Sequence, residues 1–199
     1  MGSGAQAQTP APFSAARAGA KTAPSKAALP GAFTADVAAS RLTWTGHAAV
    51  GSYAPKGTIR LKKATVALAA DGQTPRAARI VVAMPTLVAE NADLGAHLRN
   101  ADFFDVERYP TATFELTNFR ADSARGRLTI KGVTKAVRLP ATVVLTATGL
   151  RLRGTAAVDR TAFGVVYNSP SFFDISALGD QAIANVFELE FDEIGRAHV

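Results

Sequence analysis

The chain contains no cysteine, and histidine is scarce. The absence of cysteine from all 199 residues excludes disulfide frameworks, thiolate zinc sites and cysteine nucleophiles. The three histidines, His47, His97 and His198, are not followed by a second metal ligand two or four residues later, so they make a poor metal site. A Gly-rich phosphate loop, a nucleophile elbow and a dinucleotide fingerprint are also missing. We therefore expect no enzyme, no metal site and no cofactor.

Long apolar runs are absent as well. No stretch approaches the roughly 18 apolar residues that a membrane-spanning helix needs, so no membrane span is expected. Residues 1–32 are rich in Ala and Pro and are interpreted as a disordered tail or linker, whose opening MGSG resembles a cloning remnant. This segment lacks the apolar core of a signal peptide. Any natural export signal is therefore presumed to have been removed.

The basic charge is concentrated in that tail. Residues 1–30 hold Arg17, Lys21 and Lys26 and no acid, which is half of the net charge of +6. In the rest of the chain both signs are interspersed, which is typical of a solvated surface. No nucleic-acid partner is expected.

From residue 33 onward the sequence alternates between apolar and polar residues. The alternation recurs in segments such as 41–50, 136–145 and 149–160, with turn signals between them. This period is typical of antiparallel strands with one apolar face, and we expect about eight of them. One short helix is predicted over residues 91–100, capped by Asp93 and carrying Leu94 and Leu98 inward. Such strands form either a barrel or a sandwich.

Small residues on the predicted inner face favour a cavity over a filled interior. They are Gly46, Ala112, Ala141, Gly154 and Ala156. A barrel of about eight strands is the size at which the interior either fills with side chains or holds one small ligand.

Two clusters of charged residues receive structural interpretations. Asp102, Asp105 and Glu107 are read as caps that neutralise neighbouring arginines, not as a pair of catalytic acids. The pair formed by Asp159 and Arg160 follows an alternating segment and is interpreted as a strand-end ion pair rather than a head-group site.

The segment HLRNADFFDVERYPTATFEL, residues 97–116, resembles the signature of the YceI family of lipocalin-like, polyisoprenoid-binding proteins. That family has His-Leu-Arg-Ser, then Asp-Phe-Phe-Asp, then Tyr-Pro-x-Ala-x-Phe. Here Asn100 replaces the serine, which is a conservative difference. The segments GRLTIKGVTKAVRLP and AVDRTAFGV are similar to further family motifs, as are MPTLVAENADL and SFFDISALGDQAIANVFELEF. The resemblance runs in order from residue 33 to residue 194.

The resemblance implies an all-β fold, an eight-stranded antiparallel up-and-down barrel with one short helix inserted before the Asp-Phe-Phe-Asp segment. It implies a lipid-binding domain over residues 33–194, followed by a C-terminal tail at 195–199. The ligand would be an isoprenoid or fatty-acid-like lipid in an elongated apolar cavity. Family members are mostly exported, so a periplasmic or secreted location is expected. Monomer and dimer both remain open.

The predicted function is non-catalytic binding, transport or storage of that lipid. The alternative is a filled barrel that acts as a protein-interaction or stress-response module. Of the adjacent phenylalanines Phe103 and Phe104, one should point into the barrel and the other toward the helix. Wall positions are assigned by strand parity, which a β-bulge reverses. The predicted ligand-binding residues are Trp44, Ile59, Met84, Leu98, Phe103, Phe104, Tyr109, Phe114, Leu116, Ile130, Val143, Phe163, Tyr167, Phe187 and Leu189.

Overall fold

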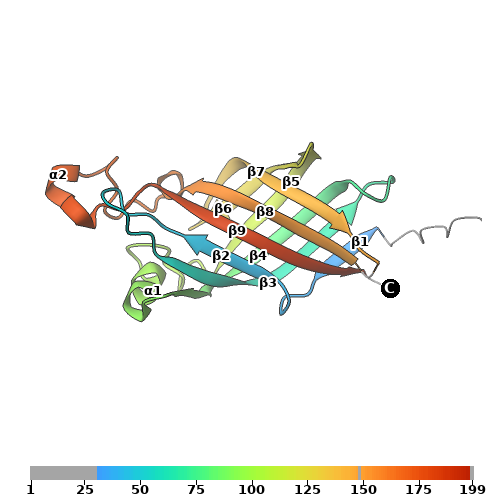
Figure 1. Cartoon of the computed structure of the whole chain (residues 1–199), viewed down its shortest axis with the longest axis horizontal. Helices are drawn as coiled ribbons and strands as arrows, with labels where there is room; N and C mark the ends of the chain where they lie inside the picture. Colours follow the sequence, from blue (N-terminus) through green and yellow to red (C-terminus); the bar gives the residue numbers. More distant parts are fainter. Residues whose placement is uncertain (1–30, 148, 198–199) are drawn as a thin grey trace, which may run out of the picture.

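The computed structural model describes residues 31–147 and 149–197, and these residues form a long barrel with helical segments toward one end (Figure 1). The strands are β1 (Ala32–Ala35), β2 (Arg41–Thr45), β3 (Lys56–Leu68), β4 (Pro75–Ala89), β5 (Thr111–Arg120), β6 (Ser123–Ile130), β7 (Val133–Leu145), β8 (Gly149–Asp159) and β9 (Val186–Ala197). The helices are α1 (Ala92–Arg99) and α2 (Ile175–Leu178), with 3₁₀ turns η1 (Arg160–Phe163) and η2 (Gly179–Gln181).

The strands close into an antiparallel barrel. Each strand from β3 to β9 pairs with the next along the chain, while β1 and β2 both lie between β3 and β9. The strands β1 and β2 therefore follow one another along a single strand position of the barrel, separated by residues 36–40. Nine strands therefore occupy eight positions around the barrel, and the predicted eight-stranded up-and-down fold is confirmed.

The period-two pattern of the sequence separates the inside of the barrel from the outside. On β8, Ala156 and Val158 are buried while Ala157 and Asp159 are exposed. The outer face carries ion pairs between neighbouring strands, such as the 2.6 Å contact of Arg151 with Asp192. Such half-exposed pairs contribute little to stability, so burial of the inner face dominates.

Helix α1 packs against β4 at one end of the barrel (Figure 1). Its N-cap is Asn91, whose side chain accepts hydrogen bonds from the backbone N–H groups of Asp93 and Leu94 at 2.8 and 3.2 Å. The prediction of Asp93 as the cap was therefore wrong, because Asn91 satisfies the first free N–H groups two residues earlier. Leu98 is buried as expected, and Leu94 also faces the barrel interior.

The strands extend beyond the predicted domain boundaries at both ends of the barrel domain. Strand β9 continues to Ala197 and pairs with β1 and β8, so residues 195–197 belong to the barrel and not to a tail. At the other end, β1 begins at Ala32, one residue before the predicted start. Most of the predicted N-terminal tail, together with His198, lies outside the described residues.

Three inward-facing strand glycines lie directly beneath aromatic rings. A Cβ atom built on Gly57 would meet the Trp44 indole, one on Gly126 would meet the Phe114 ring, and one on Gly154 would meet the Phe191 ring. The rings therefore lie against the barrel wall, in space that any side chain at these glycines would occupy. The space at Gly154, predicted to be empty, is filled by Phe191.

We predict that Gly57→Ala destabilises the barrel by about 1–3 kcal/mol, since a methyl group there overlaps the Val88 carbonyl and the Trp44 ring. The substitution should also break the 3.1 Å hydrogen bond from Trp44 Nε1 to the Val88 carbonyl. Urea unfolding followed by fluorescence of the single tryptophan would measure both effects.

The matched control is Gly46→Ala, whose added Cβ would meet only ordinary contacts at 3.7 and 3.8 Å. Equal stability of the two variants would contradict the packing role assigned to Gly57.

Candidate functional site

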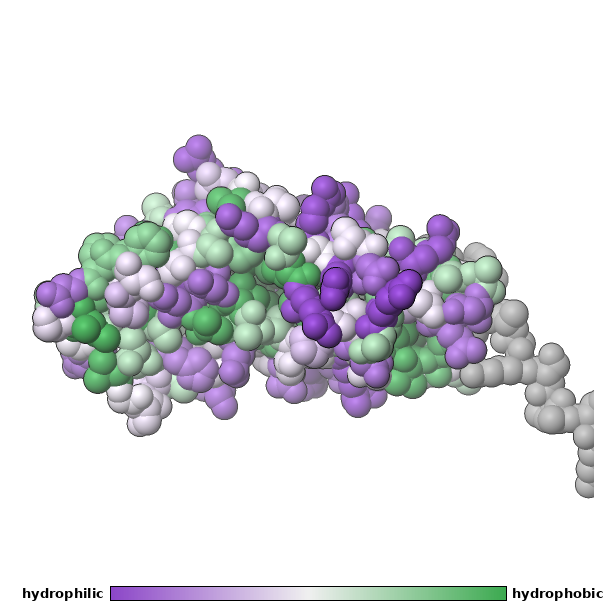
Figure 2. Space-filling view, turned by 90° about the horizontal axis from the view of Figure 1, so that it is seen from above, coloured by the Kyte–Doolittle hydropathy of each residue, from purple (hydrophilic) through white to green (hydrophobic). Residues whose placement is uncertain are grey.

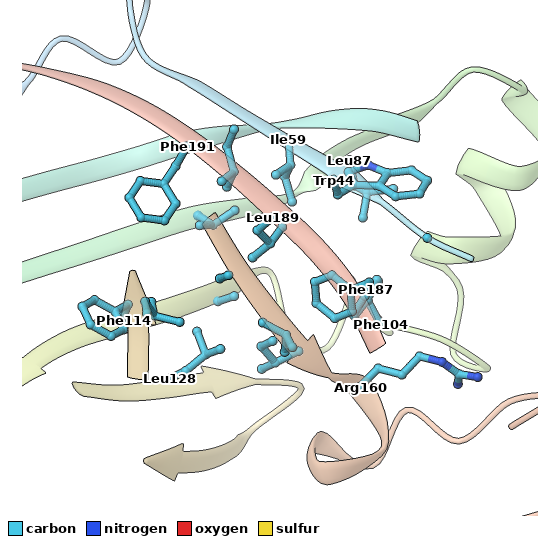
Figure 3. Close-up of a pocket in the computed structure, with 18 of the residues that line it drawn as sticks. Trp44, Ile59, Leu87, Phe104, Phe114, Leu128, Arg160, Phe187, Leu189 and Phe191 are labelled. Atoms are coloured by element: carbon cyan, nitrogen blue, oxygen red, sulfur yellow. The ribbon is translucent and has the colours of Figure 1, made fainter. Parts of the chain in front are cut away.

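An apolar cavity of about 390 Å³ runs inside the barrel. It extends from the end that carries α1 and η1, called here the helix end, toward the end that carries β1, called the β1 end. In Figure 3, Phe104 and Phe187 lie together near Arg160 at the helix end, with Ile59 and Leu189 between them and Phe191. The volume falls within the range of ligand pockets.

The β1 end is closed by a small apolar cluster of Phe33, Val66, Leu68 and Leu150. Val66 and Leu150 also border the cavity, so this cluster forms its floor. The opposite end is formed by loops, including residues 46–55 and 180–184.

Most of the predicted wall residues border this cavity. They are Trp44, Ile59, Met84, Leu98, Phe103, Phe104, Phe114, Leu116, Ile130, Val143, Phe187 and Leu189. Strand parity accounts for those on strands, whereas Leu98 lies on α1 and Phe103 and Phe104 lie in the turn that follows it.

Tyr109, Phe163 and Tyr167 lie outside the cavity lining. The Tyr109 ring lies next to Gly132 and beneath the guanidinium of Arg108. Phe163 belongs to η1 and Tyr167 to the loop that follows, so the alternation of a strand does not apply to either residue. Tyr167 instead packs against the His97 ring at 4.7 Å.

Both paired phenylalanines border the cavity, so the expected division into one inward ring and one ring toward the helix holds only in their further contacts. The centroid of the Phe104 ring lies 6.3 Å from that of Phe187. Phe103 contacts the His97 ring of α1 at 5.9 Å and lies 5.3 Å beneath the guanidinium of Arg160. The segment therefore both lines the helix end of the cavity and fastens α1 to the loop after β8.

Arg160 is 2% exposed and holds that loop together. Its guanidinium donates hydrogen bonds to the carbonyl oxygens of Val165, Ile183 and Ala184 at 2.8–3.0 Å. Burial lowers the pKa of this guanidinium, and the neighbouring Asp159 carboxylate raises it. Within the described residues Asp159 forms no ion pair with Arg160, because it caps η1 by accepting from the backbone N–H and hydroxyl of Thr161. The interpretation as a strand-end ion pair was wrong.

The acidic cluster near the phenylalanines does not neutralise its neighbouring arginines either. Arg99 Nη1 donates to the Leu87 carbonyl at 2.6 Å, and Arg108 lies over the Tyr109 ring at 5.3 Å. Among the described residues, neither arginine forms an ion pair with these acids. The two arginines instead contact a backbone carbonyl and an aromatic ring.

Sequence reasoning left out several of the residues that border the cavity, and Leu87 and Glu193 show two reasons why. Leu87 lines the wall although parity from Met84 points it outward, because the register of β3 and β4 shifts between Thr58 and Arg60. Glu193 was missed for another reason. It continues the inward series of Phe187, Leu189 and Phe191, but the alternation was followed only as far as its apolar members.

Glu193 is a buried carboxyl in an otherwise apolar wall. It is 4% exposed, it borders the cavity, and its Oε2 has no hydrogen-bond partner among the described residues. Burial raises the pKa of this carboxyl from 4.5 to about 7; the nearby Asp192 carboxylate adds to the rise, and a hydrogen bond with Ser40 opposes it. Glu193 therefore changes charge near neutral pH.

The loops at the helix end expose large apolar side chains. Phe172, Phe173 and Ile175 are between 45% and 59% exposed, and Tyr53 in the loop before β3 is 65% exposed. Figure 2 shows apolar residues gathered at the end that carries α2, whereas hydrophilic residues dominate the middle of the visible face.

Within the described residues, no group of acids and histidines is placed to hold a metal ion. No helix in this part of the chain has the length and apolar character to cross a membrane.

A family model described as a YceI-like domain matches residues 33–193. Among curated relatives, a UPF0312 protein of Pseudomonas aeruginosa (strain LESB58) is 40% identical over 80 residues, which are 37% of this chain and 42% of the relative. Protein YceI of Escherichia coli O157:H7 is 36% identical over 80 residues, with the same shares. These matches span about two fifths of the relatives' length.

Solved structures support the fold. BcnA of Burkholderia cenocepacia superposes with a TM-score of 0.65 at 20% identity, covering 80% of this chain and 98% of that one. A polyisoprenoid binding domain from Saccharophagus degradans, implicated in plant cell wall breakdown, has a TM-score of 0.64 at 13% identity and covers 83% and 98%.

We predict that Arg160→Lys destabilises the protein by about 2–3 kcal/mol, because one ammonium cannot reach all three carbonyls and leaves buried acceptors without donors. Urea unfolding measures the loss. Arg153→Lys on the outer face of β8 is the control, since Arg153 forms only a half-exposed pair with Asp192. Equal losses in the two variants would refute the anchoring role.

Glu193 should make the barrel less stable as the pH rises. Its raised pKa means that between about 4.5 and 7 the folded state keeps a proton that the unfolded state has lost. Each unit of pKa difference between the folded and unfolded states is worth about 1.4 kcal/mol. The loss of folding free energy caused by Glu193 therefore reaches about 3 kcal/mol above pH 7 and vanishes below about pH 4.5. Glu193→Gln should remove this dependence of stability on pH. The variant should therefore become increasingly more stable than the wild type from pH 5 to pH 8.

Thermal unfolding of both proteins across that range tests the prediction. Asp192 does not interfere, because its pKa is lowered by the hydrogen bond from Arg151 and it stays ionised throughout. Parallel stability curves for the two proteins would show that Glu193 is solvated in the folded state.

Proposed function

Because the chain belongs to the YceI-like family, we propose that it binds a long apolar lipid of polyisoprenoid or fatty-acid-like chemistry and carries or stores it unchanged. The observation that carries this proposal is the 390 Å³ cavity inside the barrel, whose wall is almost entirely aliphatic and aromatic. Burying one CH₂ group is worth about 0.8 kcal/mol, so each enclosed isoprene unit could contribute roughly 3–4 kcal/mol. Several units offset the cost of ordering a flexible chain.

The similar Saccharophagus degradans structure is a polyisoprenoid binding domain, which agrees with this ligand class. The alternative, a filled barrel that acts only as an interaction module, fits the cavity less well, because large central side chains would then occupy that space. We retain a periplasmic or secreted location as part of the proposal, on the basis of the family resemblance.

A catalytic role on an apolar substrate is disfavoured by the arrangement of polar groups. Glu193 has the raised pKa that an acid catalyst would need. The other titratable groups that border the cavity, such as His47, His97 and Asp180, belong to the helix-end loops and α1. Among the described residues no second acid or base stands beside Glu193 to form a reacting pair.

Organic-solvent extraction of the purified protein, followed by mass spectrometry, tests the proposal directly. A prenyl or fatty-acyl species at stoichiometric amount, also seen as added mass of the native complex, is the expected result. A ligand-free protein that also refuses added prenyl chains would overturn it.

A pair of variants localises the binding. Ala156 is 3% exposed and borders the cavity, whereas its neighbour Ala157 is exposed on the outer face of the same strand. We predict that Ala156→Phe lowers prenyl affinity at least about tenfold by filling the cavity, while Ala157→Phe leaves it unchanged. Titration of both variants with a prenyl alcohol, after circular dichroism establishes that each is folded, measures the difference. Equal affinities would place the ligand outside the barrel.

A further inference from the structure

Glu193 lies deep in the barrel, far from the helix end. It pairs with Leu152 on β8, close to the cluster of Phe33 and Leu150 that closes the β1 end. Glu193 lies six positions after Phe187 on β9, which corresponds to about 20 Å along the strand. An elongated ligand that begins between Phe104 and Phe187 would therefore end near this carboxyl.

Among the described residues, the carboxyl forms no ion pair on the inside of the barrel. Its Oε2 is unpartnered among the described residues, and the first strand position is broken beside it, at Ser40. Asp192, the nearest charged neighbour, belongs to the outward series of β9 and is held there by Arg151 and Arg153 at 2.6 and 3.3 Å. These cations are engaged outside the barrel and do not compensate Glu193.

A buried carboxyl oxygen without a hydrogen-bond partner, such as Glu193 Oε2, costs free energy that a suitable ligand group would recover. An anionic group such as a phosphate or a carboxylate would meet the acidic Glu193 side chain without a compensating cation and is disfavoured. An ammonium would have to leave water for a closed end with a single counter-charge, which is costly. A hydroxyl avoids both penalties, and because it both donates and accepts it complements Glu193 with or without its proton.

We propose that Glu193 is a specificity-determining contact that binds the hydroxyl of an uncharged lipid alcohol at the β1 end of the cavity. The inference rests on the proposed function and deepens it by naming the end group and its orientation. The alcohol lies inside near the β1 end, and the hydrocarbon chain extends back toward α1.

The test compares two probes of equal length, geranylgeraniol and the hydrocarbon in which hydrogen replaces its hydroxyl. Quenching or enhancement of Trp44 fluorescence reports binding, since Trp44 is the single tryptophan and borders the cavity. Both probes are titrated into the wild-type protein, Glu193→Leu, Glu193→Gln and the outer-face control Glu190→Leu. The ratio of the two affinities, compared between proteins, cancels the difference in probe hydration.

We expect the ratio of alcohol to hydrocarbon affinity to fall roughly 3- to 10-fold in Glu193→Leu. It should stay near the wild-type value in Glu190→Leu, and in Glu193→Gln, whose amide still donates and accepts. A ratio unchanged in Glu193→Leu, with both probes bound by the wild type, would overturn the Glu193 contact and leave the carrier proposal intact. Failure of the wild type to bind either probe would overturn both.

Discussion

The barrel can enclose a cavity because its largest side chains lie flat against the wall. Each of three rings covers a glycine on the neighbouring strand. Trp44 and Phe191 lie directly opposite their glycines, whereas Phe114 lies two residues from the residue that pairs with its glycine. With any other residue at those glycines, the rings would have to shift toward the barrel axis, where they would fill the interior. The same contacts bury aromatic surface, so the packing that stabilises the barrel also shapes its cavity.

Polar groups are confined to the two ends of this cavity and are treated differently at each. At the helix end the Arg160 guanidinium donates to three backbone carbonyls and lies over the Phe103 ring, so its charge serves the loop. At the β1 end the Glu193 carboxyl keeps an unpartnered oxygen. Because the middle of the cavity is apolar, the lipid chain that we propose as ligand would be positioned mainly by what its end meets at Glu193.

The sequence predicted the fold well because alternation is a local signal that the closed barrel respects along most strands. It placed Trp44 and Phe187 correctly for that reason. It failed where the backbone departs from a regular strand: Phe163 lies on a 3₁₀ turn, and Leu87 follows a register shift that no residue pattern announces. It also missed Glu193, although parity was intact, because a charged residue is not expected inside a barrel.

An interior left open weakens the empty protein, since cavity-lining side chains lose the packing contacts that a filled core would have. The unpaired carboxyl of Glu193 adds an electrostatic cost that grows toward neutral pH, where it ionises. A ligand that fills the cavity and hydrogen-bonds this carboxyl removes both costs together. For the proposed lipid, stability and occupancy are therefore coupled, because the free energy that the barrel forgoes in its own core would become available as binding energy.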